Sequence, residues 1–451
     1  MRAGDQKARR SGRELLEEKA WDPALRCVQC GYCLPVCPTY QSMGKESASP
    51  RGRINLVKLA AEGKMDVIRD LAEPIDLCLG CRACETACPV RVPYGQILEA
   101  AKEAVAEERK GAPSPLGERM KEMLLRHLIP HPGRLRLAGA MLWLFQKTGL
   151  QSLVLSSGLL RRWSVAADQL GKVLPRVEAP SSRLRRGALL PAQGRKKGRA
   201  AFFAGCIMDE VFHGINRSTV ALLQQAGWEV IIPGNQRCCG ALHAHQGMRE
   251  KAKQLAKDNI RAFEASGAEI YVNNAGGCGA MLQEYDLLFR DEPEWRERAA
   301  RFVERTRDIS EVLVRCGLPP FRREWEGVIV YQDSCHLRHV QKVVEEPREL
   351  LRSIPGAVYV EMEGADRCCG SGGIYNLLHF EESMKILEDK MKEVEKAGAT
   401  TIVTTNPGCH LQMRLGVERM GWTDRIRVRH LVEVLAEVCL EQKILTSVKR
   451  S

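Results

Sequence analysis

The chain has 451 residues, 44% of them hydrophobic, which is enough material for about three domains of ordinary size. The formal charge is +12, but aromatic residues make up only 5% of the chain, so a nucleic-acid-binding protein is the least favoured class. The start of the chain is too polar for a secretory signal, and the longest apolar run, 137–145, is well short of the roughly twenty residues that a spanning helix needs.

The first hundred residues contain one cysteine pattern twice. Each copy reads C-x2-C-x2-C-x3-C-P, the bacterial run that holds [4Fe-4S] clusters. Three thiolates at this spacing let one turning loop wrap three corners of a cubane, and the other run supplies the fourth corner. The expected ligand sets are therefore Cys27, Cys30, Cys33 with Cys88, and Cys78, Cys81, Cys84 with Cys37.

Structural zinc is the alternative interpretation of these runs, because C-x2-C pairs also bind zinc. Zinc usually takes its ligands as two separated pairs, whereas each run here has four cysteines followed by Pro38 or Pro89. A disulfide framework is less favoured still, since the chain opens without a signal peptide and the two-residue gaps indicate metal binding in a reducing compartment.

The segment between the two runs is expected to be helical. Ser49 is placed to cap a helix with Pro50 at its first position, Ile54, Val57 and Ala61 recur at helical spacing, and Gly63 is a natural stop. This favours a mainly α-helical ferredoxin module over the small two-sheet kind.

The positive charge is concentrated in one segment. Residues 101–200 hold 20 Lys and Arg but only 7 Asp and Glu, and the same segment contains an apolar stretch with basic flanks, LAGAMLWLFQKTGLQSLVLSSGLLRRW. Such a region can lie on an anionic membrane or dock on an acidic partner. The alternative is a helical connector whose apolar face packs on a neighbouring domain, followed by the loop-like RLRRGALLPAQGRKKGR.

A second internal repeat begins near residue 200. Four cysteines of the first copy recur at offsets of 129 to 131 residues, each copy contains the tripeptide Cys-Cys-Gly, and the two copies are here called CCG repeats. The two sets are Cys206, Cys238, Cys239, Cys278 and Cys335, Cys368, Cys369, Cys409.

Each CCG repeat alternates short apolar strands with helical stretches, which predicts a parallel α/β layer. The expected strands are 201–203, 230–232 and 270–272, then 328–331, 358–360 and 402–403. The cysteines follow the carboxyl ends of these strands, where the loops of open α/β sheets form ligand sites. The two pseudo-equivalent sites are expected to face each other or to lie near a pseudo-twofold axis.

Adjacent thiolates suit a multinuclear iron–sulfur cluster, and Gly240 and Gly370 permit the tight turn that such a site needs. A zinc site with the same cysteines and a redox thiol pair are the alternatives. Four histidines near these cysteines are expected to be hydrogen-bonding or surface residues: His243, His245, His336 and His410. Of these, His336 and His410 are the ones to test as ligands. Two further cysteines, Cys316 and Cys439, are expected to be structural or surface thiols. AGGCGA at 275–280 is expected to be a cluster loop, because it lacks the nucleotide pattern G-x-G-x-x-G.

The order of these motifs, with the AGGCGAML, NPGC and SPRGRI segments, resembles the iron–sulfur subunits of glycolate oxidase. The resemblance implies an electron-transfer partner of one or more FAD-containing subunits that oxidise glycolate or D-lactate, with two [4Fe-4S] clusters passing electrons towards a quinone or another acceptor. No catalytic residue is assigned, and the isolated chain is expected to be inactive.

Two related classes are the alternatives. One is a thiol or disulfide oxidoreductase similar to heterodisulfide reductase, whose repeats end in C-x2-C, although Met281 and Gln412 replace the second cysteine here. The other is the iron–sulfur subunit of anaerobic glycerol-3-phosphate dehydrogenase.

The expected fold is an α-helical ferredoxin domain followed by two α/β cysteine-rich domains. The division is 1–110 for the two-cluster domain, 111–199 for the basic connector, 200–318 for the first CCG repeat and 319–451 for the second. The expected location is the cytoplasm, with peripheral attachment to the inner face of the cell membrane as the alternative, and the CCG repeats are expected to add one or two iron–sulfur or zinc sites.

Overall fold

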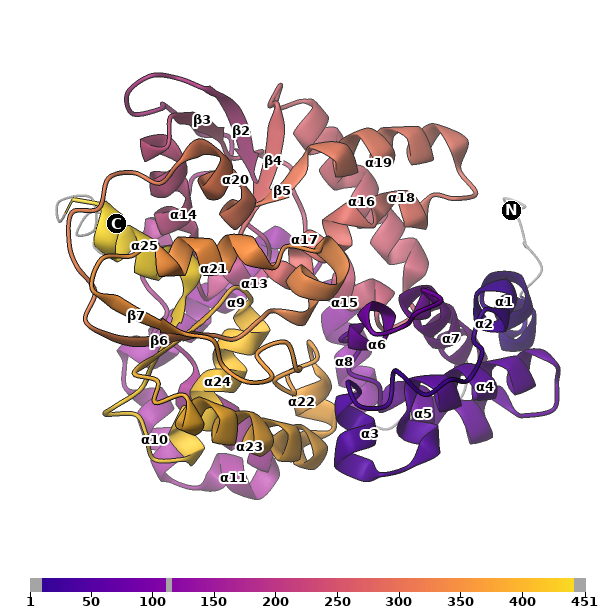
Figure 1. Cartoon of the computed structure of the whole chain (residues 1–451). Helices are drawn as coiled ribbons and strands as arrows, with labels where there is room; N and C mark the ends of the chain where they lie inside the picture. The colour runs from indigo at the N-terminus through magenta and orange to yellow at the C-terminus, as the bar shows by residue number, and fades with distance from the viewer. Residues whose placement is uncertain (1–9, 111–115, 442–451) are drawn as a thin grey trace. The chain divides into compact units, whose positions relative to one another are not determined.

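The computed structural model describes residues 10–110 and 116–441 (Figure 1). It divides into two compact units. The first comprises the chain up to Glu122 together with the separate segment Leu242–Ala252. The second comprises Met123–Ala241 and the chain from Lys253 onwards. Among the described residues, no helix combines the length and the hydropathy of a membrane-spanning segment. The division at residues 110, 199 and 318 remains a prediction.

The N-terminal unit consists of helices and loops, with no strand in residues 10–110. Its core is formed by apolar side chains of α1, α4 and α7, among them Leu16, Val57 and Ile97. The helices are α1 (Gly12–Lys19), α2 (Trp21–Leu25), α3 (Pro38–Met43), α4 (Pro50–Ala61), the π-helical turn Val67–Leu71, α5 (Ala72–Asp76), α6 (Ala83–Thr86) and α7 (Tyr94–Glu108).

Helix α4 begins and ends where the sequence predicts. The Ser49 side chain accepts a hydrogen bond from the Gly52 N–H, Pro50 occupies the first position, and Gly63 adopts a left-handed φ of 72° just beyond the end. Ile54, Val57 and Ala61 are buried, so the helical spacing of these residues marks the face that packs on the core.

The second unit contains two sheets with the same order of parallel strands. The first is β1-β3-β2-β4-β5 and the second is β7-β6-β8-β9, so β2, β3, β4 and β5 correspond to β6, β7, β8 and β9. The strands are β1 (Leu189–Leu190), β2 (Gly198–Phe202), β3 (Trp228–Ile231), β4 (Ile270–Asn273), β5 (Thr306–Asp308), β6 (Gly327–Tyr331), β7 (Ala357–Val360), β8 (Thr401–Thr404) and β9 (Arg427–His430).

The six strands predicted from the sequence are present, with bounds shifted by up to three residues, and the predicted parallel pairing is confirmed between them. Three strands are additional. Strand β1 pairs antiparallel with β3 inside the stretch expected to be a loop, and β5 and β9 close the two sheets.

Helices flank the strands of both repeats, and one hydrophobic core continues through them. Phe202 and Leu313 of the first repeat and Ile329 and Leu435 of the second belong to this core. The helices of the first repeat are α13 (Ile207–Glu210), α14 (His213–Gln225), α15 (Ala241–Ala244), α16 (Arg249–Glu264), α17 (Gly276–Gln283), α18 (Tyr285–Leu288), α19 (Pro293–Arg305) and α20 (Ile309–Cys316). Those of the second are α21 (Glu345–Arg352), α22 (Tyr375–Leu378), α23 (Phe380–Lys396), α24 (Pro407–Arg419) and α25 (Leu431–Cys439).

The final helices of the two repeats correspond as well. Both α20 and α25 open with a capping box, formed by Asp308 in one and His430 in the other. Cys316 and Cys439 are the last residues of these helices. Cys439 is buried in the shared core, and Cys316 is partly buried and packs against the same core. The structure therefore gives both thiols packing roles.

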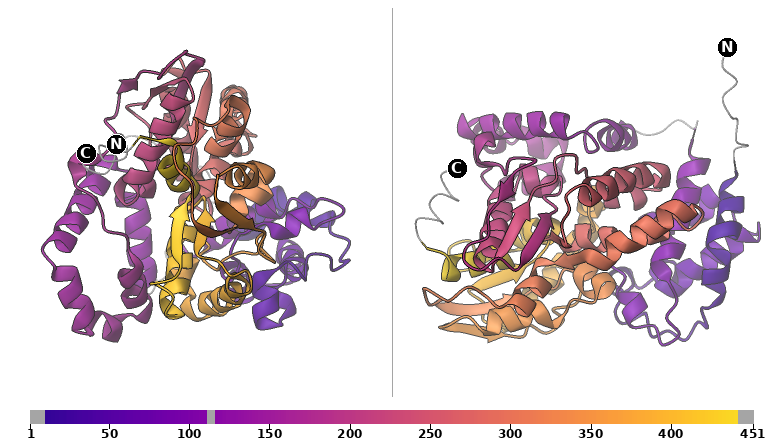
Figure 2. Two further views of the ribbon diagram at one scale, coloured as in Figure 1. Left: turned by 60° about the vertical axis from the view of Figure 1, so that its left-hand side comes forward. Right: turned by 90° about the horizontal axis from the view of Figure 1, so that it is seen from above.

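The basic segment forms a series of helices. They are α8 (Leu116–His127), α9 (Pro132–Lys147), α10 (Leu150–Ser156), α11 (Leu159–Trp163) and α12 (Val165–Val173). Within the second unit, the purple and magenta helices of this segment run along one side of the sheets (Figure 2). Val173 of α12 packs into the core of the second CCG repeat.

His430 also joins the two repeats. Its Nε2–H donates to the Asn274 carbonyl at 2.9 Å, and its Nδ1 accepts from the Val432 N–H at 3.2 Å. Both bonds need the neutral ring, because protonated Nδ1 would face another N–H. Burial lowers the pKa of His430 to about 4 from its ordinary 6.5.

The pKa shift of His430 predicts a loss of stability in acid. The unfolded state takes up a proton as the pH falls through 6.5, while the folded state resists until about pH 4. Between neutral pH and about pH 5, the wild type should lose ~2 kcal/mol of unfolding free energy that His430→Gln does not lose. Denaturant unfolding of the full chain measures this difference, with the exposed His127→Gln as control. An identical pH slope for His430→Gln and wild type would contradict the prediction.

Candidate metal centres

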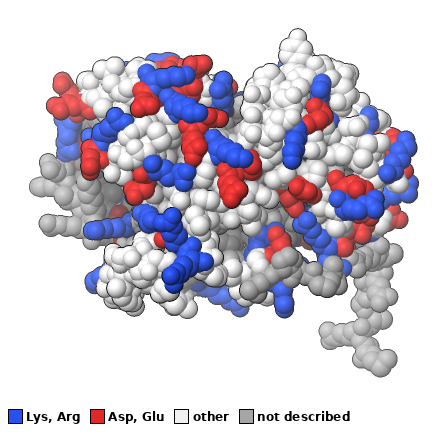
Figure 3. Space-filling model, turned by 90° about the horizontal axis from the view of Figure 1, so that it is seen from below, with Lys and Arg blue, Asp and Glu red and all other residues white. Residues whose placement is uncertain are grey.

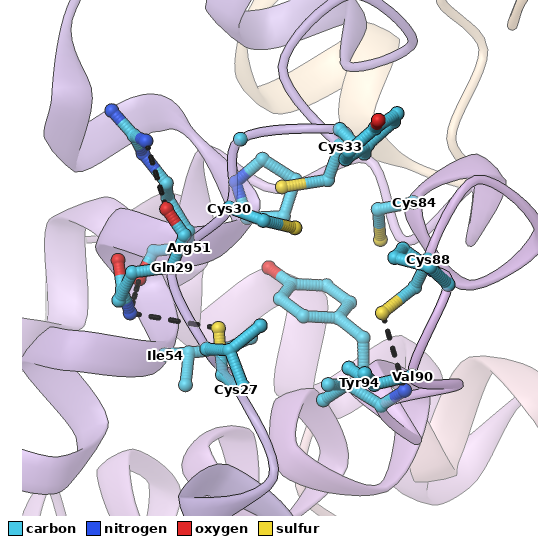
Figure 4. Close-up of a pocket in the computed structure, with 16 residues that line it drawn as sticks. Cys27, Gln29, Cys30, Cys33, Arg51, Ile54, Cys84, Cys88, Val90 and Tyr94 are labelled. Carbon is cyan, nitrogen blue, oxygen red and sulfur yellow. Dashed lines mark hydrogen bonds between the residues drawn. The ribbon is translucent and has the colours of Figure 1, made fainter.

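The first cysteine run lines a pocket in the N-terminal unit. Its lining includes Cys27, Cys30 and Cys33 of the first run and Cys88 of the second. Figure 4 shows these sulfur atoms turned towards one space, beside the ring of Tyr94. The structure thus brings together the four thiols of the first predicted set, and Cys84 reaches the same wall.

The two runs turn in the same way. Gln29 and Gly80 occupy equivalent positions and both have left-handed φ values, 58° and 64°. Gly31 and Arg82 form a second equivalent pair, at 89° and 62°. A left-handed conformation is costly for residues other than glycine, so both loops are held in shape by what surrounds them.

Amide groups point at several of these thiols. The Gly80 N–H donates to the sulfur of Cys78 and the Val92 N–H to the sulfur of Cys88, both at 3.4 Å. The Gln29 side-chain amide lies 3.5 Å from the sulfur of Cys27. Such donors stabilise negative charge on sulfur, and they surround iron–sulfur clusters and help to set their potentials.

Two thiols of the second predicted set, Cys37 and Cys78, lie near a buried arginine. Arg53 of α4 is 1% exposed and donates to the Pro74 carbonyl at 2.7 Å and to the Thr39 hydroxyl at 3.1 Å. The Thr39 hydroxyl lies 3.3 Å from the sulfur of Cys37. Burial lowers the pKa of Arg53, but the charges of Cys78, Tyr94 and Cys37 outweigh it and raise the pKa overall.

The thiols of this set affect one another's ionisation. Burial raises the pKa of Cys84, and the charges of Cys81, Cys78 and Cys37 raise it further. Burial likewise raises the pKa of Cys37, against the opposing effect of Arg53. A thiol of this kind stays protonated at neutral pH unless a metal replaces the proton, so the set is suited to metal binding rather than to free thiol chemistry.

The N-terminal thiols fit iron–sulfur clusters in number, in element and in their amide donors. A structural zinc site needs four ligands at bonding distance from one ion, whereas a cubane spreads its four thiolates over separate irons. The N–H groups of Gly80 and Val92 that donate to sulfur agree with the cluster.

In the first CCG repeat, three loops bring four cysteines together. Cys206 follows β2, Cys238 and Cys239 follow β3, and Cys278 lies in the first turn of α17 after β4. The sulfurs of Cys206 and Cys238 are 3.6 Å apart. The hydrogen bond to Cys238 and then burial raise the pKa of Cys206. The hydrogen bond to Cys238 lowers the pKa of Cys239, but the contact with Cys278 and burial outweigh it and raise this pKa overall.

Two polar side chains of this repeat donate hydrogen bonds to backbone carbonyls of the Cys-Cys-Gly loop. The Asn259 amide donates to the Cys238 carbonyl at 3.0 Å, and the Tyr285 hydroxyl donates to the Cys239 carbonyl at 2.9 Å. Asn259 and Tyr285 are themselves hydrogen bonded at 2.9 Å. Gly240 has a φ of 93°, as the predicted tight turn requires.

The second CCG repeat is arranged in the same way with different neighbours. Cys335 follows β6, Cys368 and Cys369 follow β7, and Cys409 lies in the first turn of α24 after β8. Gly370 has a φ of 89°, and a Cβ there would lie 2.7 Å from the Ser383 carbonyl. Buried Lys390 donates to the Gly364 carbonyl. Burial lowers the pKa of Lys390 to about 8, although the Cys369 and Cys368 charges oppose this.

The cysteine loops of the two repeats contact one another. The Gly276 N–H donates to the Thr405 carbonyl at 2.9 Å, and the Gly277 N–H donates to the Asn406 side-chain oxygen at 3.0 Å. The amide of Asn406 lies 3.6 Å from the sulfur of Cys409. Asn406 thus links the loop of Cys278 to the thiol of Cys409.

The four histidines differ in their surroundings. His336 places Nδ1 3.4 Å from the Cys335 sulfur. His410 is buried edge-on against Phe212, and its pKa is lowered to about 3, chiefly by burial. His245 forms an ion pair with Glu99 at 3.4 Å in the N-terminal unit, and His243 is buried.

The positions that would carry a further cysteine in the heterodisulfide enzymes pack inside the repeats. Met281 is buried. Gln412 donates to the Ser383 hydroxyl at 2.9 Å and accepts from the Asn376 amide at 3.0 Å.

Sequence reasoning missed the supporting residues Arg53, Asn259, Tyr285, Lys390 and Asn406. Arg53 lies in the SPRGRI segment, which was the only signal for any of them. The other four residues act through tertiary contacts, which no local sequence pattern predicts.

Three family models match the chain. The model described as "4Fe-4S dicluster domain" matches residues 23–92, and the one described as "Cysteine-rich domain" matches 200–283 and 329–414. A third, "Glycolate oxidase iron-sulfur subunit, linker region", matches residues 117–174.

Two named relatives match most of the chain, and a third matches about half of it. The "Probable glycolate oxidase iron-sulfur subunit" of Bacillus subtilis is 48% identical over 417 residues, which is 92% of this chain and 93% of the relative. The "Glycolate oxidase iron-sulfur subunit" of Escherichia coli is 30% identical over 94% of this chain and 96% of its own length. "Lactate utilization protein A" of Oceanobacillus iheyensis is 31% identical over 52% of this chain and 96% of its own length.

Proposed function

Because the chain belongs to the family of glycolate oxidase iron–sulfur subunits, we propose that it carries electrons within a complex that oxidises glycolate or D-lactate to the 2-oxo acid. One or more FAD-containing partner subunits would oxidise the hydroxy acid, and a quinone or another acceptor would receive the electrons. The observation that supports the proposal is that thiols of both cysteine runs lie close together within the N-terminal unit.

We assign two [4Fe-4S] clusters to these groups. Cys27, Cys30 and Cys33 would hold one with Cys88, and Cys78, Cys81 and Cys84 would hold the other with Cys37. Each bound cluster supplies one-electron transfer. The chain's own part is to position the thiols for metal binding, to direct the Gly80 and Val92 amides at sulfur, and to keep Arg53 buried beside Cys37 and Cys78.

We further propose that at least one CCG repeat binds metal, as an iron–sulfur cluster or as zinc. The ligands would be Cys206, Cys238, Cys239 and Cys278, or Cys335, Cys368, Cys369 and Cys409. The mutual pKa effects of these thiols and the polar support of their loops favour this proposal.

The proposed division of labour predicts that the purified chain alone does not oxidise glycolate or D-lactate. Dye-linked turnover should appear only when the FAD-containing partner is added, because hydride removal needs a flavin or a comparable cofactor. The Cys30→Ser variant should lose electron delivery from that partner, and Cys316→Ser should retain it as a thiol-loss control. Turnover by the chain without a flavoprotein would overturn the assignment.

The crossed ligand sets predict which cysteine substitutions behave alike. Cys88→Ser should match Cys27→Ser, with loss of about four of eight irons and of one cluster's EPR signal. Cys37→Ser should match Cys78→Ser and remove the other signal. Anaerobic iron analysis and low-temperature EPR make the comparison. If Cys88→Ser instead matched Cys84→Ser, each run would hold its own cluster.

The CCG proposal predicts metal beyond the N-terminal clusters. Anaerobically prepared full chain should contain more metal than the roughly eight irons of two cubanes. Cys239→Ser or Cys369→Ser should remove this extra metal while leaving the N-terminal EPR signals unchanged. Iron and zinc analysis of the wild type and of both variants, with Cys316→Ser as control, decides the matter. A total of eight irons without zinc, in a chain whose CCG thiols are all titratable, would refute it.

A further inference from the structure

The helices of the basic segment expose apolar side chains to an unusual degree. On α9, Leu137, Met141 and Leu144 are 65%, 64% and 53% exposed, and their spacing places them on one face. The opposite face carries the buried residues of this helix, Leu135 and Gly139. A Cβ at Gly139 would lie 2.4 Å from the Glu210 carboxylate, so this side of α9 is docked on the protein.

The next two helices contain no buried residue among those described. Leu150 and Leu153 protrude from α10, and Leu159 and Trp163 protrude from α11. Trp163 is 73% exposed, the highest value among the exposed large apolar side chains of the described residues. Helices whose apolar side chains face water on this scale gain stability from something that covers them.

The same helices lack acidic residues. Residues 123–167 contain six Lys or Arg and not one Asp or Glu. By contrast, blue and red side chains are interspersed over much of the face drawn in Figure 3. Arg161 and Arg162 are exposed directly beside Trp163, and neither forms an ion pair with any described residue. A partner that covers these helices should therefore present negative charge at its surface and apolar groups beneath it.

We propose that the exposed faces of α9, α10 and α11 bind the surface of an anionic phospholipid bilayer. Leucine and tryptophan side chains would enter the boundary between headgroups and acyl chains, and the arginines would contact lipid phosphates. Tryptophan with flanking cations is typical of this interfacial region. Protein interfaces concentrate apolar groups in a compact centre, whereas here cations and apolar side chains follow one another along three successive helices.

Co-sedimentation of the full chain with vesicles tests this proposal. The wild type should bind vesicles of phosphatidylcholine mixed with phosphatidylglycerol, should bind pure phosphatidylcholine poorly, and should bind less as the salt concentration rises. Arg161→Gln with Arg162→Gln should weaken binding about thirtyfold, from roughly 1 kcal/mol for each cation. Arg290→Gln with Arg296→Gln, at exposed arginines of the first CCG repeat, should leave binding unchanged.

A second variant tests the apolar contribution. Leu137→Ser, Met141→Ser and Leu144→Ser together should also release the chain from the mixed vesicles, while circular dichroism and visible absorbance stay unchanged. Failure of the wild type to bind mixed vesicles, or equal binding by the Arg161/Arg162 variant, would overturn the proposal. The proposal would also be overturned if the Arg161/Arg162 variant lost binding to the flavoprotein partner but still bound vesicles, since the surface would then recognise an acidic protein. These readouts do not depend on electron transfer and stand apart from the proposed function.

Discussion

The two cysteine runs of the N-terminal unit are interlocked, and this constraint shapes the unit around them. Cys27, Cys30 and Cys33 of the first run share a pocket with Cys84 and Cys88 of the second, and Cys37 of the first run lies close enough to Cys81 of the second to affect its ionisation. The two loops therefore depend on each other for their positions. Helices α4 and α7 pack on a common core and hold the loops in this relation.

The C-terminal repeats solve a similar problem by duplication. Each repeat gathers four cysteines at the carboxyl ends of β-strands, where the loops of a parallel sheet converge. The two sets of loops are then hydrogen bonded to each other through Thr405 and Asn406. The copies have diverged around this shared arrangement: Asn259 and Tyr285 support one pair of cysteines, and Lys390 lies behind the other.

Much of this architecture could be predicted from the sequence because the signals are local. Cysteine spacing marked every thiol of the sites, and Ser49 and Pro50 marked the start of α4. Strands β5 and β9 were missed because they are short and rich in polar residues, as in Thr306–Asp308, so that only their place at a sheet edge defines them. The roles of Asn259 and Asn406 depend on contacts with residues far along the chain, which spacing does not reveal.

Arg53 gives the N-terminal unit a built-in direction. The two cysteine runs share their cysteine spacing and their backbone turn. The buried guanidinium of Arg53 lies beside Cys37 and Cys78, whereas Arg51, at the pocket of the first run, is partly exposed. A fixed positive charge in a medium of low polarity favours the reduced state of whatever redox centre lies next to it, because reduction adds an electron. The two proposed clusters would then differ in potential. An electron that can reach either of them would reside more often at the cluster beside Arg53, so that the pair would pass electrons downhill in one direction.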